Sequence, residues 1–128
     1  MKKINLKTLL SLSIIFLLSS CGQTIDYDTD EEYIKVEYLN GPDILYYKGT
    51  PYTGIFIRYI DEEKKQLGVK RTFQDGKENG LFEMYYENGQ LSEKGTFKDG
   101  EKDGLFEYYD EDGELTKKET WKEGKIQK

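Results

Sequence analysis

The chain has 128 residues, a formal net charge of −6, one cysteine and no histidine. Without histidine, histidine-based triads and histidine-containing metal sites are excluded, and an acidic chain is a poor match for nucleic acid. We therefore expect a non-catalytic protein that uses no metal and no cofactor and binds no nucleic acid.

Residues 1–20 have the pattern of a cleaved signal peptide. Lysines at positions 2, 3 and 7 precede an uncharged apolar stretch at residues 9–18. This stretch is shorter than the about 20 apolar residues of a transmembrane helix, which favours a signal peptide. It ends in Leu18-Ser19-Ser20-Cys21, which resembles the lipobox of bacterial lipoproteins. We expect cleavage after residue 20 and lipid attachment at Cys21.

Lipidation of Cys21 predicts a location at the cell envelope. Acyl chains contribute about 0.8 kcal/mol for each buried methylene group and anchor a domain that has no membrane helix. By resemblance to lipoproteins of bacteria with two membranes, Gly22 after the cysteine favours the outer membrane in such a host. Loss of the signal lysines changes the net charge from −6 to −9, and no thiol is left for a disulfide.

Residues 21–32 are predicted to be a lipidated, acidic and disordered tether. Residues 22–32 contain almost no apolar side chain, so burial cannot offset the entropy lost on ordering them. The same composition argues against a first edge strand in this segment. The folded domain is expected to span residues 33–128.

Strand signals dominate from residue 33 onward. Residues 33–39 and 44–47 are rich in β-branched and aromatic residues, and a turn sequence containing Gly41 and Pro42 lies between them. The remainder is an internal repeat: a segment that begins at Gly80 recurs at Gly104, and a looser copy begins at Gly54. Such a repeat indicates an array of one small supersecondary unit.

Two sets of turn dipeptides divide each copy into two strands. Asn88-Gly89 and Asp112-Gly113 are typical of type I′ turns, in which both central residues have positive φ. The second set follows an aromatic residue in each copy and comprises Asp75-Gly76, Asp99-Gly100 and Glu123-Gly124. The sequence therefore predicts an all-β fold, an antiparallel meander of about eight strands built from repeated β-hairpins, with no helix.

The first regular copy contains a set of glycine, aromatic and turn positions that the next copy matches: Gly80, Phe82, Tyr85, Tyr86, Asn88, Gly89, Leu91, Phe97, Asp99, Gly100 and Gly104. This pattern resembles the MORN (membrane occupation and recognition nexus) repeat in its bacterial variant form, over residues 46–125. The resemblance implies a repeat sheet and no catalytic residue. Bacterial members of this family are frequently labelled antitoxins, and eukaryotic relatives are described as scaffolds or lipid-contacting modules.

Paired tyrosines and the tip of the looser copy are the candidate partner-binding sites. In that copy residues 61–65 replace the Asn-Gly turn, which predicts a wider, charged and mobile tip. Exposed tyrosine offers a large contact area at a low entropic cost. In the alternative interpretation the tyrosines form the core, and we expect at least one of each pair to be buried. The candidate binding residues are Tyr85, Tyr86, Tyr108, Tyr109, Lys64 and Lys65.

These observations favour a non-catalytic, membrane-anchored lipoprotein whose repeat sheet acts as a binding or scaffold module. Its partner is an unidentified protein or an envelope polysaccharide. The alternative is an antitoxin or immunity-type protein that binds and neutralises a toxic partner. Export argues against a cytoplasmic toxin–antitoxin pair, because a cytoplasmic target would never meet the mature domain, and leaves immunity against an exported effector open.

Overall fold

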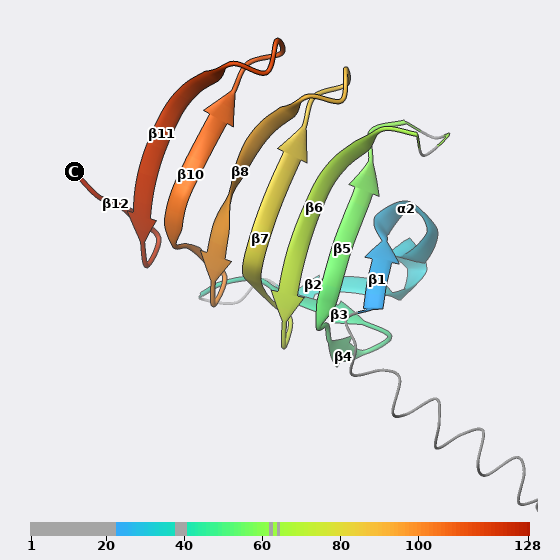
Figure 1. Cartoon of the computed structure of the whole chain (residues 1–128). Helices are drawn as coiled ribbons and strands as arrows, with labels where there is room; N and C mark the ends of the chain where they lie inside the picture. The colour runs from blue at the N-terminus through green and yellow to red at the C-terminus, as the bar shows by residue number, and fades with distance from the viewer. Residues whose placement is uncertain (1–22, 38–40, 62, 64) are drawn as a thin grey trace, which may run out of the picture.

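The computed structural model describes residues 23–37, 41–61, 63 and 65–128. The predicted signal peptide, Cys21 and Lys64 lie outside the described residues. The described chain forms a large curved sheet of nine strands and a small sheet of three (Figure 1). This arrangement confirms the all-β prediction.

The large sheet is a meander with one added strand. Its strand order is β1-β5-β6-β7-β8-β10-β11-β12, and β9 pairs with β8 off this path. Every pairing from β5 to β12 is antiparallel, as predicted, whereas β1 runs parallel to β5. Its strands are β1 (Gln23–Asp26), β5 (Gly54–Tyr59), β6 (Leu67–Gln74), β7 (Lys77–Tyr85), β8 (Leu91–Lys98), β9 (Glu101–Lys102), β10 (Gly104–Tyr109), β11 (Leu115–Lys122) and β12 (Lys125–Ile126).

The small sheet covers one face of the large one. It consists of β2 (Ile34–Glu37), β3 (Ile44–Tyr47) and β4 (Thr50–Pro51), which cross the lower end of the large sheet in Figure 1. Two short helical turns, α2 (Tyr27–Asp30) and η1 (Glu31–Tyr33), join β1 to β2. Neither of these described helical turns is long and apolar enough to cross a membrane.

Residues 23–32 are ordered, so the prediction of a disordered tether is wrong for this segment. Gln23 pairs with Gly54 and Asp26 with Ile57, which makes β1 the parallel edge strand of the large sheet. Ile25 has no exposed surface and joins the core. The Asp26 side chain accepts a hydrogen bond from the Asp28 amide at 3.1 Å and begins the helix that the sequence did not predict.

The first set of turns differs from the predicted type I′ geometry. At Asn88-Gly89 only Gly89 has positive φ (87°), so a type I′ turn there is wrong. Gly89 donates to the Tyr86 carbonyl and Tyr86 to the Gln90 carbonyl, which gives a three-residue loop with a glycine bulge. The loop at Gly113 repeats this pattern. Positive φ at two consecutive residues occurs instead at Asp75-Gly76, Asp99-Gly100 and Glu123-Gly124.

The latter turns also connect successive repeats. The Gly76 amide donates to the Tyr52 carbonyl at 2.8 Å. In the same way, the Gly100 amide donates to the Glu78 carbonyl at 2.8 Å, and the Gly124 amide donates to the Lys102 carbonyl at 3.0 Å. Because each bond joins a turn to the preceding unit, the spacing of the copies is fixed by backbone groups that every copy contains.

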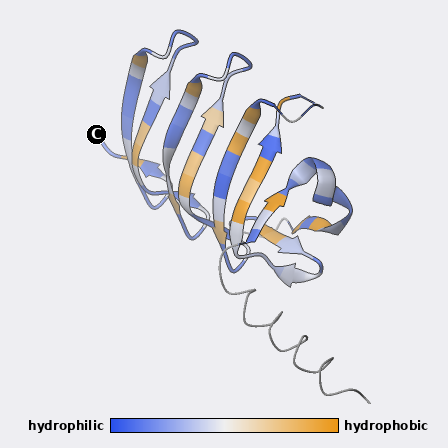
Figure 2. Ribbon diagram, turned by 45° about the vertical axis from the view of Figure 1, so that its right-hand side comes forward, coloured by the Kyte–Doolittle hydropathy of each residue, from blue (hydrophilic) through white to orange (hydrophobic). Residues whose placement is uncertain are grey.

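Aromatic rings fill the space beneath the covered face in two clusters. The first contains Ile25, Leu45, Tyr52 and Phe73, with Ile34, Tyr47 and Phe56 packed against it. In the second, Phe106 contacts the rings of Phe82, Phe97 and Trp121. Figure 2 shows apolar residues on β1 and β5 and on parts of β6, β7 and β10, whereas β11 is largely hydrophilic. Among the described residues, four of the six buried apolar side chains belong to the first cluster, so most of the core lies near the amino-terminal edge.

Candidate functional site: an aromatic groove between the two sheets

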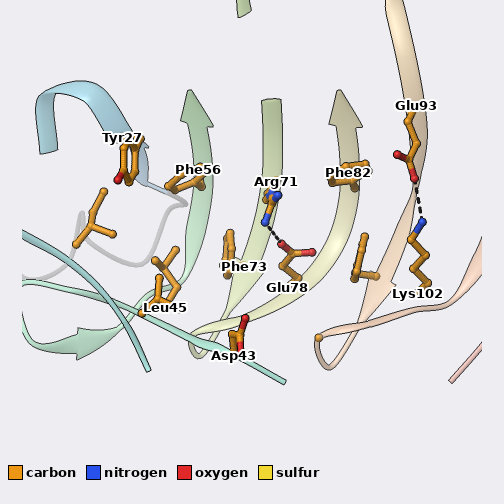
Figure 3. Close-up of a pocket in the computed structure, with 14 residues that line it drawn as sticks. Tyr27, Asp43, Leu45, Phe56, Arg71, Phe73, Glu78, Phe82, Glu93 and Lys102 are labelled. Atoms are coloured by element: carbon orange, nitrogen blue, oxygen red, sulfur yellow. Dashed lines mark hydrogen bonds and ion pairs between the residues drawn. The ribbon is translucent and has the colours of Figure 1, made fainter. Parts of the chain in front are cut away.

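A groove of about 430 Å³ lies between the large sheet and the small one. Rings from four strands form its floor, and apolar side chains of β2 and β3, with Tyr27 of α2, form its wall (Figure 3). We call it the aromatic groove. Its lining is Tyr27, Ile34, Val36, Asp43, Leu45, Phe56, Arg71, Phe73, Glu78, Phe82, Glu93, Phe97, Gly100 and Lys102.

The repeat brings the floor rings together. Phe56 lies opposite Arg71 on the neighbouring strand, and Arg71 lies opposite Phe82 on the next one. Since side chains alternate between the two faces of a strand, all three project from the same face. Phe73 follows Arg71 by two residues and contacts Phe56, with ring centroids 6.1 Å apart. An apolar group that enters the groove therefore meets rings on adjacent strands.

Two ion pairs place charge on this floor. Nη1 of Arg71 lies 2.7 Å from Oε1 of Glu78, and Nζ of Lys102 lies 2.9 Å from Oε1 of Glu93. The Arg71 guanidinium is 5.6 Å from the Phe82 ring centroid, and its Nε is buried without a hydrogen-bond partner in the described structure. The groove thus combines apolar rings with an unused hydrogen-bond donor.

The surroundings shift the pKa of one group in each ion pair. Burial raises the pKa of Glu78; the charge and hydrogen bond of Arg71 act in the opposite direction, and Asp43 adds to the rise. Burial lowers the pKa of Lys102, but hydrogen bonds and charge from Glu93 and Tyr108 outweigh it, and the net shift is upward. Lys102 therefore stays a cation at neutral pH, 4.2 Å from the Phe106 ring centroid.

The groove lining consists of apolar and aromatic residues, charged side chains and Gly100. Its carboxylates at Glu78 and Glu93 are paired with cations, and the lining contains no serine, threonine or cysteine that could act as a nucleophile. No group of three or more potential metal ligands occurs among the described residues.

The candidate tyrosines do not converge on one surface. Tyr108 projects from the groove face and donates to Glu119 at 2.9 Å. Tyr85 and Tyr109 project from the opposite face, where the Tyr109 hydroxyl donates to Glu107 at 3.2 Å. All four tyrosines are partly exposed, so the expectation that one of each pair is buried is wrong. Phe82 and Phe106 occupy the core positions instead.

The other candidates lie at hairpin tips. The Tyr86 hydroxyl donates to the Tyr109 carbonyl at 2.8 Å and so connects two repeats. The Lys65 amide donates to Asp61 at 3.2 Å, and its Nζ pairs with Glu63. Lys65 does not line the groove, and whether these residues bind a partner stays a prediction.

The face opposite the groove has a row of alternating charges. Lys94 and Lys118 each lie 2.8 Å from Glu107, and Lys70 lies 3.8 Å from Glu83. Hydrogen bonds from Lys118 and Lys94 lower the pKa of Glu107 to about 2. This row fixes side chains on a face that the small sheet leaves uncovered.

The Glu107 row predicts an acid-sensitive contribution to stability. The pKa of Glu107 is lower in the folded chain than the unfolded value of about 4.3, so the ionised carboxylate stabilises the folded state when the pH is above about 4.3. This stabilisation is lost as the pH falls toward 2. We expect the urea midpoint to fall more for the wild type than for Glu107→Gln between about pH 7 and about pH 3. Equal losses in the two proteins would contradict this assignment.

The groove residues were not predicted from the sequence, although the repeat contains the row of phenylalanines that forms part of the groove floor. Phe56, Phe82 and Phe106 occupy equivalent repeat positions, which indicates one row of rings on one face. Nothing in the repeat pattern indicates that Val36 and Leu45 pack across that row, because they precede the repeats. Arg71 is also irregular, since the equivalent residue in the next copy is Gly95.

Comparison with known proteins supports the repeat. Residues 78–99 and 102–123 each match the family model described as MORN repeat variant. The match confirms the resemblance for the two regular copies, covers less than half of the chain and does not include the looser copy at Gly54. No curated protein matches the chain. MORN repeats are in general protein- or membrane-binding modules without enzymatic activity.

Proposed function

We propose that the protein is a non-catalytic, membrane-anchored lipoprotein that binds an extended protein segment in the aromatic groove at the cell envelope. The observation that best supports this proposal is the groove itself, which is accessible to solvent, is lined by rings from adjacent strands and has β2 as one wall. The similarity of two copies to a repeat that generally serves binding supports the same conclusion.

The chemistry of the groove suits a protein segment with an apolar side chain. Protein interfaces have an apolar centre and a polar rim, and the groove offers Phe73 and Phe82 beside the Arg71–Glu78 and Lys102–Glu93 pairs. Each pair is internally neutralised, and the Asp43 carboxylate adds a negative charge to the lining, so a strongly anionic ligand is disfavoured. Strong dependence of binding on salt is not expected.

An exposed strand edge explains why an extended segment is the preferred occupant. Within the described structure β2 pairs only with β3, so its other edge carries backbone groups that no strand uses. A segment that adds to this edge gains main-chain hydrogen bonds, and alternate side chains then point into the groove. Val36 is 38 % exposed and lines the groove from this strand.

The proposed anchor rests on the sequence around Cys21, which lies outside the described residues. A diacylated cysteine anchors a folded domain stably, whereas one acyl chain gives only reversible attachment. An immunity-type role is the alternative form of the same binding activity. The identity of the bound partner separates the two, because an immunity protein requires a toxic effector as its ligand.

Substitution of Val36 with aspartate is expected to abolish partner binding and leave the fold intact. The new carboxylate enters the lining of the groove that Phe73 and Phe82 also line, and it disfavours an apolar group there. Partner retention from envelope extracts is measured with the acylated protein, and thermal unfolding monitors the fold. Leu81→Asp is the matched control, because Leu81 is 44 % exposed on the opposite face of β7 from Phe82.

The two variants distinguish binding in the groove from binding on the opposite, charged face. Loss of the partner with Val36→Asp but not with Leu81→Asp supports the groove. The reverse pattern would assign binding to the charged face, and a retained ligand that is polysaccharide would overturn the choice of a protein partner.

A further inference from the structure

The described fold begins at Gln23, two residues after the proposed lipid attachment site. Gln23 pairs with Gly54, and the single proton of the Tyr52 hydroxyl is shared between the Gln23 carbonyl and the Ile55 carbonyl, the latter at 2.9 Å. Ile25, two residues further on, is fully buried. β1 is therefore held by backbone pairing, by a buried tyrosine and by the core.

This position limits how far the domain can stand from the bilayer. Two extended residues span at most about 7 Å, so the Cα atom of Gln23 lies within that distance of the Cα atom of Cys21. If Cys21 carries acyl chains, as the proposed function requires, this end of the sheet lies at the lipid headgroups. A flexible tether of residues 21–32 would have allowed several times this reach.

A series of tyrosine contacts leads from Tyr52, which binds the Gln23 carbonyl, to exposed side chains that suit a position at the headgroups. The Tyr47 ring lies 6.0 Å from the Tyr52 ring and 6.3 Å from the Tyr33 ring. Nζ of Lys48 lies 4.7 Å from the Tyr33 ring centroid and 5.0 Å from that of Tyr47. Tyr33 is 44 % exposed and Lys48 is exposed. Tyrosine is enriched at membrane–water interfaces, and lysine extends its ammonium toward headgroups.

We propose that the corner formed by Tyr33, Tyr47, Lys48 and β4 contacts the bilayer surface and orients the lipoprotein. The partner is the headgroup layer of the membrane that holds the acyl chains. Because β5 starts at this corner and extends for six residues, its far end lies about 20 Å away, and the hairpin tips point away from the membrane.

Charges around the corner determine how the contact depends on lipid composition. The Tyr47 hydroxyl donates to Asp30 at 3.1 Å, and a hydrogen bond to Glu32 raises the pKa of Tyr33. These carboxylates offset the charge of Lys48, so anionic lipid gives little added attraction. The short covalent connection and the tyrosine rings set the orientation, which is expected to be similar on neutral and anionic vesicles.

Fluorescent labels at the two ends of the sheet test the orientation. The acylated protein has no free thiol, so Thr50→Cys and Glu111→Cys each provide a single labelling site. Both residues are exposed, Thr50 in β4 at the corner and Glu111 at a hairpin tip. On phosphatidylcholine vesicles with a headgroup quencher, we expect loss of most fluorescence at position 50 and little loss at position 111.

Two controls separate this inference from the anchor on which it rests. A long Gly-Ser insertion between Gly22 and Gln23 is expected to reduce quenching at position 50 while the protein still floats with vesicles. Equal quenching at both positions in a floating protein would overturn the orientation and leave the anchor intact. Failure of the acylated chain to float would overturn the anchor and this inference together.

Discussion

Replacement of Phe106 with alanine is expected to lower the free energy of unfolding by about 3–5 kcal/mol. The Phe106 side chain has no exposed surface, and its ring centroid lies 5.7 Å from that of Phe97 and 6.4 Å from those of Phe82 and Trp121. A β-carbon at Gly95 would lie 2.6 Å from the Phe106 ring. The neighbouring strand therefore lacks a side chain that could fill the cavity.

Leu105→Ala is the matched control, since the two residues are adjacent on β10. Leu105 is 48 % exposed on the opposite face, where truncation of an exposed side chain usually changes stability by about 0.5 kcal/mol or less. Urea denaturation at neutral pH measures both variants. Similar losses for Phe106→Ala and Leu105→Ala would show that this ring cluster is not the core of the carboxy-terminal repeats.

Gly54→Ala is expected to detach β1 from the sheet. Gly54 has φ of 151°, and a β-carbon there would lie 2.1 Å from the Gln23 carbonyl oxygen and 2.4 Å from the Tyr52 hydroxyl. The clash is with backbone, which cannot move away without breaking the β1–β5 pairing. Because Ile25 would then leave the core, we expect a loss of about 2–5 kcal/mol, the range of a large buried truncation.

Amide hydrogen exchange at residues 24–26 measures this detachment directly. In Gly54→Ala these amides are expected to exchange rapidly, whereas those of β7 and β8 keep their protection. Gly41→Ala provides the control, since nothing lies within 4 Å of a β-carbon at Gly41 and it needs no positive φ. Retained protection at residues 24–26 in Gly54→Ala would contradict the parallel pairing of β1.

The repeat made most of the sheet predictable. Equivalent glycines at Gly54, Gly80 and Gly104, with aromatic residues between turn dipeptides, indicate hairpins because each feature is local in sequence. The turn type was harder to predict, because it depends on whether the loop between the paired strands contains two residues or three. Asn88-Gly89 has the composition of a type I′ turn, yet the Tyr86–Gln90 pairing adds a third loop residue.

The amino-terminal segment was misassigned because its order comes from distant contacts. One isoleucine among polar residues gives no strand pattern, but β5 offers an edge for pairing and the core offers a site for Ile25. For the same reason the aromatic groove could be predicted only in part. The row of phenylalanines was visible in the repeat, whereas the wall supplied by Val36 and Leu45 depends on the path of the chain before it.

Photo-crosslinking in intact cells tests most directly whether the repeat sheet binds a protein in the aromatic groove. A photoreactive residue is placed at Val36, on the groove wall, or at Leu81, on the opposite face of the sheet. The groove assignment predicts a discrete protein adduct at position 36, in the membrane fraction, and none at position 81. An adduct at position 81 alone, or none at either position, would contradict it.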